Sequence, residues 1–454
     1  MWSISIAHGI SVNKIMEANP NVDPNNLWVG QQICIPSSCQ GIFYTIKQGD
    51  SLWLISREHN VTVQDIINLN PPLVDPNNLQ VGQQICIPTT EVTTPIVNRE
   101  SLTYLYGNKS EHYLDLLSKT QNSIKTVCPD FFELSNAGNL LLASSDKLNS
   151  KFIEVVHGQG AKITPFISNH WDRTLGQITL DNRENLSNQI VQAINQYNLD
   201  GVNVDIENVN ELYRDQYTDF VRLLRQRLPS DKIVSVAVAA NPQGWTTGWH
   251  GSYDYKALSE YAYLMIMAYD ESYQGGPEGP ISSSQFFNKS IQYALSQGVP
   301  KDKITAGIPF FGRYWKVGDA IGGLGFAAVD VENLLKNYSS TSRFDDTTKS
   351  AYAEVTIKPG QTEPTIWGGR KLTAGIYHIW YDSPESTQYK LNVINGYDIK
   401  GAGSWSLGQE IPSVWDFYTT ALNNEIISPT PESLPKLGPS PEPEPNPNPP
   451  APEF

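Results

Sequence analysis

Apolar strand-like runs alternate with helical patterns through most of residues 98–424. The clearest helix is Tyr213–Leu228, where apolar residues recur every three or four positions. Strands that alternate with helices predict a parallel sheet, and eight such units predict an α/β fold of the (β/α)8 TIM barrel type. The stretch 317–400 is too long for one unit and predicts a small α+β insertion between strands 7 and 8. The eight predicted strands are Leu102–Tyr106, Val127–Leu134, Lys162–Ile167, Gly201–Glu207, Ile233–Ala240, Tyr263–Tyr269, Ile304–Phe310 and Ala402–Trp405.

An internal repeat precedes this block. Trp2–Ser5 matches Trp53–Ser56, and Val29–Pro36 matches Val81–Pro88 almost identically. In the second copy, alternating residues predict a first strand at 43–46 and a closing strand at 84–87, with two helices between them. Each copy is therefore expected to be a βααβ module, the first lacking its opening strand.

The repeat resembles the LysM module, and the match is carried by Tyr44, Gly49–Leu52, Ile55, Asn70–Pro71 and Leu79–Pro88. LysM modules bind N-acetylglucosamine-containing polymers. The resemblance therefore implies that a glycan-binding groove is formed by Gly49, Asp50, Ser51, Asn70 and Pro71, and in the first copy by Asn19 and Pro20. The alternative is that these residue types serve only to make turns.

Composition shifts set the expected domain boundaries. The last segment, 429–454, holds 11 of the chain's 31 prolines and buries too little apolar surface to fold by itself. The predicted organisation comprises LysM module 1 at 1–37, LysM module 2 at 42–89, a linker at 90–97, the barrel at 98–424 and a disordered tail at 425–454.

The overall composition excludes several classes of protein. A net charge of −15 argues against nucleic-acid binding, which needs a surplus of cations. No apolar run reaches the roughly 18 residues of a membrane span. No basic region followed by an apolar run opens the chain, so no signal peptide is visible; because the first repeat lacks its opening strand, we expect that the chain starts inside a domain, and the absence of a signal then carries little weight. We expect a monomer.

Cysteine and histidine spacing gives no metal site. Cys34, Cys39, Cys86 and Cys128 form no CxxC pair, and the histidines are scattered. Three disulfide pairings are open, and buried or free thiols are expected rather than a disulfide framework. We expect no metal and no cofactor.

The fourth predicted strand carries an unusual polar row. Since a strand has a period of two, Asn203, Asp205 and Glu207 share one face, and the residues between them share the other. In a barrel the apolar face lies under the helices, so the polar row points inward and ends where barrel active sites lie. A structural polar network is the alternative.

This run resembles the DxxDxDxE signature of family 18 glycoside hydrolases. Asp200, Asp205 and Glu207 match it, whereas Asn203 replaces an aspartate. In the third strand Ser168–His170 replaces the usual S-x-G-G. Further similar motifs are Met267–Asp270, Gly307–Arg313 and Gly401–Gly408. With the LysM pair in front, the layout is similar to spore germination and cortex-lytic enzymes of bacilli, followed by bacterial chitinases.

The resemblance implies a retaining mechanism in which the 2-acetamido group of the sugar attacks the anomeric carbon. It makes Glu207 the general acid and base, Asp205 the group that orients the acetamide and raises the pKa of Glu207, and Tyr269 a donor to the acetamide oxygen. Asn203, Asp270 and Trp405 would bind the substrate, with Asp270 in contact with the bound sugar and Trp405 as the apolar floor under it. Asn203 is expected to donate to Asp205 without exchanging a proton with it, which predicts an active but slower enzyme. For Tyr269 and Trp405 the alternative is core packing.

Three functions therefore stay open. The first is cleavage of β-1,4 bonds next to N-acetylglucosamine in peptidoglycan of the spore cortex or cell wall. The second is the same chemistry on chitin. The third is an inactive glycan-binding protein. The expected location is the spore coat, cortex or cell wall, with secretion as the alternative.

Overall fold

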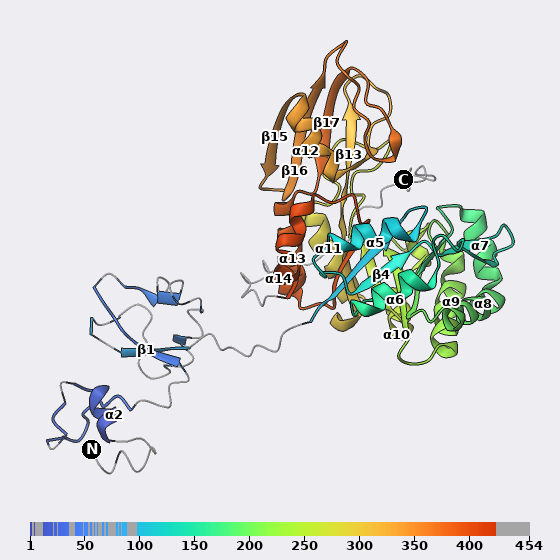
Figure 1. Cartoon of the computed structure of the whole chain (residues 1–454). Coiled ribbons are helices and arrows are strands. Elements are labelled where there is room, and N and C mark those ends of the chain that lie inside the picture. Colours follow the sequence, from blue (N-terminus) through green and yellow to red (C-terminus); the bar gives the residue numbers. More distant parts are fainter. Residues whose placement is uncertain are drawn as a thin grey trace. The chain divides into compact units, whose positions relative to one another are not determined.

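The structure is a computed structural model, and it divides the chain into two units, Met1–Ile96 and Val97–Phe454. It describes residues 98–423 without a break (Figure 1). Before these it describes residues 1, 4, 12–20, 22–24, 26–35, 41–48, 50–52, 55, 56, 59, 61, 66, 67, 70, 79, 81, 82 and 84–88. The predicted linker, 90–97, and the predicted tail, 425–454, lie outside the described residues.

The N-terminal unit contains α2 (Val12–Glu17), β1 (Gly41–Thr45) and β2 (Gln84–Pro88). β1 and β2 pair antiparallel, so the two strands predicted for the second repeat are confirmed. A small core of buried aliphatic residues holds this copy together, formed by Ile46, Leu52, Ile55, Ile66, Ile85 and Ile87. The two helices are described only in part.

The cysteines do not all behave as expected. Cys86 is disulfide-bonded, so the prediction of thiols alone is wrong for this residue. Cys34 and Cys128 are free thiols. Cys39 lies outside the described residues.

The second unit is built on one curled, parallel sheet. Strand pairing runs in the order β8-β9-β10-β11-β12-β18-β3-β4-β7. β7 and β8 are consecutive pieces of one segment and pair with opposite neighbours, which closes the sheet into the predicted eight-stranded barrel. Its strands are β3 (Glu100–Leu105), β4 (Thr126–Pro129), β7 (Lys162–Ile163) with β8 (Phe166–Ser168), β9 (Gly201–Asp205), β10 (Ile233–Ala239), β11 (Tyr263–Met267), β12 (Ile304–Pro309) and β18 (Gly401–Trp405).

The predicted strand Val127–Leu134 is two separate strands in the structure, β4 and β5. The run 127–134 breaks after Pro129, and a short antiparallel hairpin follows, formed by β5 (Phe132–Leu134) and β6 (Leu140–Leu142). The hairpin joins the sheet through β8.

Helices surround the barrel, and several begin at side-chain caps. Asn149, Asp172 and Ser283 each accept a hydrogen bond from a backbone N–H in the first turn of their helix. The helix predicted at 213–228 is confirmed as α9. The helices are α5 (Ser110–Ser118), α6 (Ser150–Gly158), α7 (Arg173–Asp181), α8 (Arg183–Gln196), α9 (Arg214–Arg227), α10 (Tyr255–Tyr261), α11 (Ser284–Ser296), α13 (Pro384–Tyr397) and α14 (Tyr418–Asn423).

The insertion is an antiparallel sheet with one helix, and it rises from the barrel as a separate layer (Figure 1). It starts earlier than predicted, because β13 follows β12 after a single residue, and it ends earlier, because α13 packs against α11 and β18 of the barrel. The elements of this second sheet thus span 311–381, against predicted bounds of about 317 and 400. Its elements are β13 (Phe311–Lys316), β14 (Leu324–Ala327), α12 (Ala328–Asn337), β15 (Ser339–Asp345), β16 (Ser350–Ile357) and β17 (Gly375–Tyr381).

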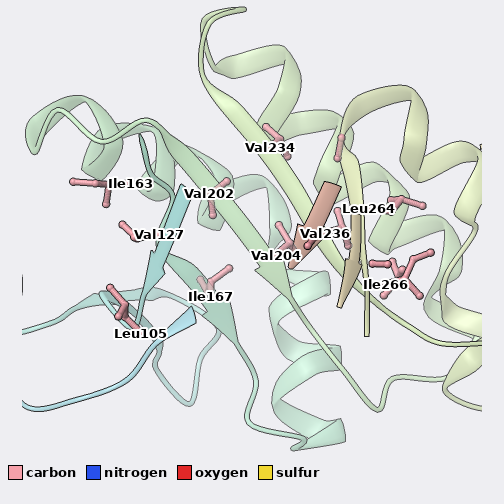
Figure 2. Close-up of a cluster of buried hydrophobic side chains, with 14 of the residues drawn as sticks. Leu105, Val127, Ile163, Ile167, Val202, Val204, Val234, Val236, Leu264 and Ile266 are labelled. Carbon is pink, nitrogen blue, oxygen red and sulfur yellow. The ribbon is translucent and has the colours of Figure 1, made fainter. Parts of the chain in front are cut away.

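The main core lies between the barrel strands and the helices. Figure 2 shows aliphatic side chains of neighbouring strands, including Val202, Val204, Val234 and Val236, gathered in this layer. Close strand contact also constrains the backbone. Gly201 has a φ of +155°, and a Cβ there would lie 2.0 Å from the carbonyl oxygen of Ile233, so no larger residue fits.

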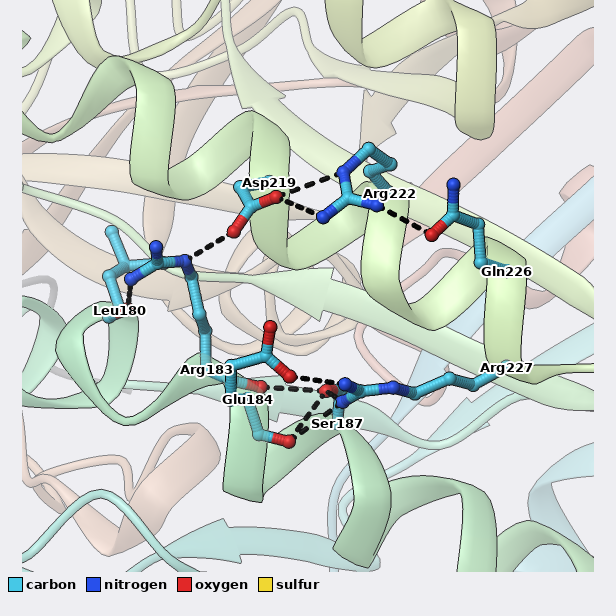
Figure 3. A network of polar contacts seen from close by, with 8 residues as sticks. All are labelled: Leu180, Arg183, Glu184, Ser187, Asp219, Arg222, Gln226 and Arg227. Carbon is cyan, nitrogen blue, oxygen red and sulfur yellow. Dashed lines mark hydrogen bonds and ion pairs between the residues drawn. The ribbon is translucent and has the colours of Figure 1, made fainter.

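Two outer helices are joined by ion pairs (Figure 3). Arg183 Nε on α8 lies 2.7 Å from Asp219 Oδ2 on α9. Arg227 on α9 returns to α8, where it pairs with Glu184 and contacts Ser187. Partly exposed pairs like these each contribute little, so the network mainly sets the alignment of the two helices.

Candidate active site

The alternating faces predicted for the fourth strand are present in β9. Val202, Val204 and Ile206 are fully buried in the core under the helices. Asn203 and Asp205 point to the other side, into the barrel, and are also buried. Because buried polar groups need partners, the contacts of this row decide what it can do.

Asn203 is held by two residues, Ser235 on the adjacent strand β10 and Tyr104 on β3 across the barrel. Its Oδ1 accepts a hydrogen bond from Tyr104 Oη at 3.0 Å, and its Nδ2 donates to Ser235 Oγ at 2.8 Å. The expected donation from Asn203 to Asp205 is not made. Asp205 Oδ1 has no hydrogen-bond partner within the described part of the chain. The amide is thus held within a network of neutral groups in the barrel floor.

Asp205 is a carboxyl group in an apolar environment. Its side chain is almost inaccessible, with 4% of the residue exposed. Burial raises the pKa of Asp205 to about 7, and the charge of nearby His170 opposes this rise. Burial raises the pKa because water no longer stabilises the charged form.

Glu207 lies two residues further along the chain, beyond the C-terminal end of β9. Burial, together with the charges of Asp205 and Asp270, raises the pKa of Glu207 well above its usual range. Asp205 and Glu207 therefore titrate as a coupled pair, in which ionisation of one carboxyl opposes ionisation of the other. The arrangement keeps Glu207 protonated while Asp205 is charged.

Aromatic side chains line the barrel around the carboxyl groups. Tyr269, two residues beyond the end of β11, and Trp405, the last residue of β18, belong to one buried cluster inside the barrel. Trp405 packs against Tyr104, with ring centroids 4.8 Å apart, and against Tyr106 at 5.5 Å. Burial raises the pKa of Tyr269 well above its usual value, and the negative charges of Asp205, Glu207 and Asp270 raise it further. The Tyr269 hydroxyl therefore stays protonated.

Asp270 is bound on one side by an arginine. Arg313 on β13 donates to Asp270 Oδ1 from Nε at 2.9 Å and from Nη2 at 2.6 Å. The backbone of Asp270 has a φ of +62°, a conformation that is uncommon outside glycine. Arg313 lies in the Gly307–Arg313 motif, but no role for it could be inferred from the sequence alone.

The loop after the third barrel strand, β7 with β8, contacts the backbone of Glu207. Asn169 contacts the backbone of Glu207, and His170 Nε2 lies 2.8 Å from Glu133 Oε2. The hydrogen bond to Glu133 raises the pKa of His170. In the sequence, Ser168–His170 stands out only as a departure from a motif. The one signal for a role of Asn169 is that a polar asparagine directly follows a buried strand.

Partly exposed aromatic residues lie on the loops beside the barrel mouth. Trp171 and Trp249 have ring centroids 5.0 Å apart, and His250 lies 4.0 Å from Trp249 and 4.5 Å from Trp245. Burial in this cluster lowers the pKa of His250 to about 4. The cluster is tied to the site, because Asn208 Nδ2 donates to the carbonyl of Trp171.

The predicted glycan-binding residues of the N-terminal unit are only partly described. Asn19 and Asn70 are buried at equivalent positions, and each amide bonds to its own module. Asn70 Nδ2 donates to the carbonyls of Ile66 and Cys86, and Asn19 repeats this pattern with Ile15 and Cys34. These two amides hold their modules together, and a glycan-binding role for them stays a prediction.

The remaining residues of the predicted groove differ in how well they are described. Asp50 Oδ2 accepts hydrogen bonds from Tyr44 Oη and Lys47 N. Ser51 is half-buried and Pro20 exposed. Gly49 and Pro71 lie outside the described residues.

Two further features of the described residues bear on function. No three His, Cys, Asp or Glu side chains among them gather as metal ligands do. None of their helices combines the length and the apolar character that a membrane crossing requires.

Comparison with known proteins agrees with this architecture. Residues 141–410 match the family model of the glycosyl hydrolases family 18, and residues 1–36 and 44–88 match the LysM domain. The putative sporulation-specific glycosylase YdhD of Bacillus subtilis is 26% identical over 425 residues, which cover 90% of this chain and 93% of the relative.

Two other relatives extend the comparison. The cortical fragment-lytic enzyme of Bacillus subtilis is 25% identical, over 82% of this chain and 96% of its own length. The crystal structure of the Bacillus cereus spore cortex-lytic enzyme SleL has the same fold, with a TM-score of 0.64 and 23% identity over 93% of this chain and 95% of the other. The family model spans more than half of the chain and includes the strand that carries Asp205 and Glu207. This protein is therefore a glycoside hydrolase of family 18 with LysM domains in its N-terminal unit.

Proposed function

We propose that the protein cleaves β-1,4 bonds next to N-acetylglucosamine in peptidoglycan, with retention of configuration and with the substrate's acetamide group as the nucleophile. The observation that carries this proposal is a pair of carboxyl groups: Asp205, buried at the end of β9, and Glu207, half-buried two residues beyond it. Their mutual repulsion keeps one proton on the pair over a wide pH range, which suits an acid next to an anion.

In this proposal Glu207 donates its proton to the oxygen of the leaving sugar, and later takes a proton from the attacking water. The ionised form of Asp205, which forms as the pH passes its pKa of about 7, accepts a hydrogen bond from the acetamide N–H and stabilises the positive charge of the cyclic intermediate. The unpartnered Asp205 Oδ1 supports this role, because a buried acceptor of this kind is costly unless a ligand pairs with it.

Tyr269 and Trp405 complete the site. The Tyr269 hydroxyl stays protonated, which makes it a donor for the acetamide oxygen. Trp405 forms the apolar floor against which a sugar ring packs. Asp270 has one oxygen engaged with Arg313, and we propose that it contacts the sugar through the other. This mechanism differs from the two-carboxylate scheme, because the second carboxyl group does not bond to the sugar.

Asn203 has a defined consequence in this mechanism. Its amide is held by Tyr104 and Ser235, so Asp205 has no acid at position 203 with which to exchange a proton. The acid function of Glu207 is unaffected, because it depends on Asp205 and on burial. We therefore propose an active enzyme that is slower than one with an aspartate at position 203.

The proposed substrate follows from the relatives and the LysM domains. Two of the relatives are named as a putative sporulation-specific glycosylase and a cortical fragment-lytic enzyme. Binding of N-acetylglucosamine-containing wall polymers by the LysM domains would hold the enzyme at the spore cortex or cell wall. Chitin shares the same sugar and is the second candidate, since a class V chitinase of Medicago truncatula is 24% identical over 51% of this chain.

Mass spectrometry of soluble products tests the proposal. The wild type and Glu207→Gln are incubated with spore-cortex peptidoglycan and, separately, with chitin oligomers. The proposal expects muropeptides that end in N-acetylglucosamine from the wild type alone. Products only from chitin would replace the substrate and keep the mechanism. Polymer binding without any Glu207-dependent product would mean that the protein is an inactive glycan-binding relative.

A further inference from the structure

We infer that Asn169 is a positioning residue that holds the general acid Glu207 in place. The inference rests on the proposed function, because it takes Glu207 to be the acid. It concerns a residue that touches neither the substrate nor the reacting atoms and acts through the backbone of Glu207.

The need for such a residue arises where β9 leaves the sheet. The ladder between β8 and β9 pairs Phe166 with Asn203 and ends with Ser168 opposite Asp205. Glu207 lies beyond this last pair, so the ladder gives its backbone no support. An acid that must meet a glycosidic oxygen needs a defined position, and displacement by about 1 Å can cost about 100-fold in rate.

Beyond the last strand pair, the side chain of Asn169 makes the hydrogen bonds to the Glu207 backbone that a neighbouring strand would otherwise make. Glu207 N donates to Asn169 Oδ1 at 2.7 Å, and Asn169 Nδ2 donates to the carbonyl of Glu207 at 2.8 Å. The amide therefore pairs with both backbone groups of one residue, as a neighbouring peptide unit would in a sheet. An ionised aspartate of the same size would offer acceptors alone, whereas the asparagine amide offers a donor and an acceptor side by side.

The amide is itself fixed from behind. Asn169 is fully buried, and its Nδ2 also donates to the carbonyl of Asp172 at 2.7 Å. Gly176 on α7 leaves space for it, since a Cβ at this position would lie 2.7 Å from Asn169 Nδ2. The helix thus packs directly against the group that holds Glu207.

The next residue is held from the same loop. Asn208 has a φ of +56°, and Arg173 donates to its carbonyl from Nε at 2.9 Å and to its Oδ1 from Nη2 at 3.0 Å. Residues 169–173 therefore bracket Glu207 and Asn208, and Asn169 is the member that contacts the acid directly.

The test uses the dependence of the rate on the leaving group. Chitotetraose has a sugar leaving group that needs a proton, whereas 2,4-dinitrophenyl N,N′-diacetyl-β-chitobioside releases an acidic phenol that needs almost none. Since kcat/KM reports the first irreversible step, we expect Asn169→Ala to lower it roughly 10- to 100-fold for chitotetraose. For the dinitrophenyl substrate we expect a loss of less than about threefold.

Two further variants keep the result interpretable. Gly176→Ala pushes on the Asn169 amide without removing it and is expected to give the same selective loss, but smaller. Asn395→Ala is the matched control. Asn395 is also a buried amide that bonds to two partners, Arg99 Nε and the carbonyl of Ala421, but it lies on α13. It is expected to lower the Tm without changing the ratio of the two kcat/KM values.

The outcomes distinguish the positioning role from the proposed function. If Glu207→Gln shows the selective loss and the Asn169 and Gly176 variants do not, the positioning role is refuted and the proposed function stands. If Glu207→Gln reduces both substrates equally, the acid role of Glu207 fails and the positioning role fails with it. An equal loss on both substrates in Asn169→Ala, matching Asn395→Ala, would reduce Asn169 to a purely structural residue.

Discussion

Replacing Asp205 by asparagine should make the catalytic unit more stable at neutral and higher pH while it removes activity. Burial raises the pKa of Asp205 to about 7, against about 3.9 for a free aspartate. The native state therefore keeps this proton between about pH 4 and pH 7, where the unfolded chain has lost it. In the wild type, this group lowers stability progressively as the pH rises through that window.

The magnitude follows from the shift. About three pKa units at about 1.4 kcal/mol each correspond to about 4 kcal/mol by pH 8, as an upper value because the site can relax when it ionises. The side chain is only 4% exposed, so solvent screening takes little away from this figure. Asparagine has nearly the same shape and no charge, so the variant should gain up to this amount at pH 8 and almost nothing at pH 4.

The assay is calorimetric unfolding of the full chain at both pH values, following the transition of the catalytic unit. Asp200→Asn is the matched control, because Asp200 stands at the other end of the same strand. Burial tends to raise the pKa of Asp200, but hydrogen bonds from Ile163 N, His157 and Lys162 outweigh it and lower the pKa. Asp200→Asn should therefore destabilise, and more so at pH 8. An Asp205→Asn variant that is destabilised equally at both pH values would refute this reasoning.

Three other predictions follow from single groups. Removal of the Asp205 charge should lower the pKa of Glu207, so the basic limb of any residual kcat/KM profile of Asp205→Asn should move to lower pH. A limb that does not move would show that the charge of Asp205 does not raise the pKa of Glu207. Lys390→Met should cost about 3–5 kcal/mol in urea unfolding, because Lys390 and Asp382 form an ion pair at 2.6 Å with side chains 1% and 2% exposed, and its loss leaves a buried carboxyl alone; a cost below about 1 kcal/mol would contradict this. Burial lowers the pKa of His250 to about 4, so this group should take away up to about 3 kcal/mol of stability as the pH falls from about 6.5 to 4; the measurement is the stability of the wild type minus that of His250→Gln across this range, and a constant difference would contradict it.

The barrel and its polar row could be predicted because both follow from how apolar and polar residues repeat over short stretches of sequence. Alternation along 201–207 separated the core-facing residues from Asn203 and Asp205, and the eight strand positions follow from apolar runs of the same kind. The bounds of the insertion could not be predicted this way. Phe311 continues the apolar run of β12, and only the antiparallel pairing of β13 with β17 reveals that a second sheet has begun.

The hydrogen-bond partners of the site residues could not be predicted from the sequence either. Tyr104 and Asn203 are 99 positions apart, and they meet because β3 and β9 face each other across the barrel. The expectation that Asn203 bonds to Asp205 considered only neighbours on one strand. Asn169 was missed for the same reason, since its contact with Glu207 depends on how two loops meet beyond the end of a ladder.

The anomeric configuration of the first product tests the central claim most directly. Hydrolysis of chitotetraose by the wild type is followed by proton NMR, with Glu207→Gln as the blank, before the new reducing end equilibrates. Attack by the acetamide, assisted by Glu207, predicts that the β-anomer appears first and the α-anomer later by mutarotation. Initial formation of the α-anomer would show direct displacement by water and would contradict the proposed roles of Asp205 and Glu207.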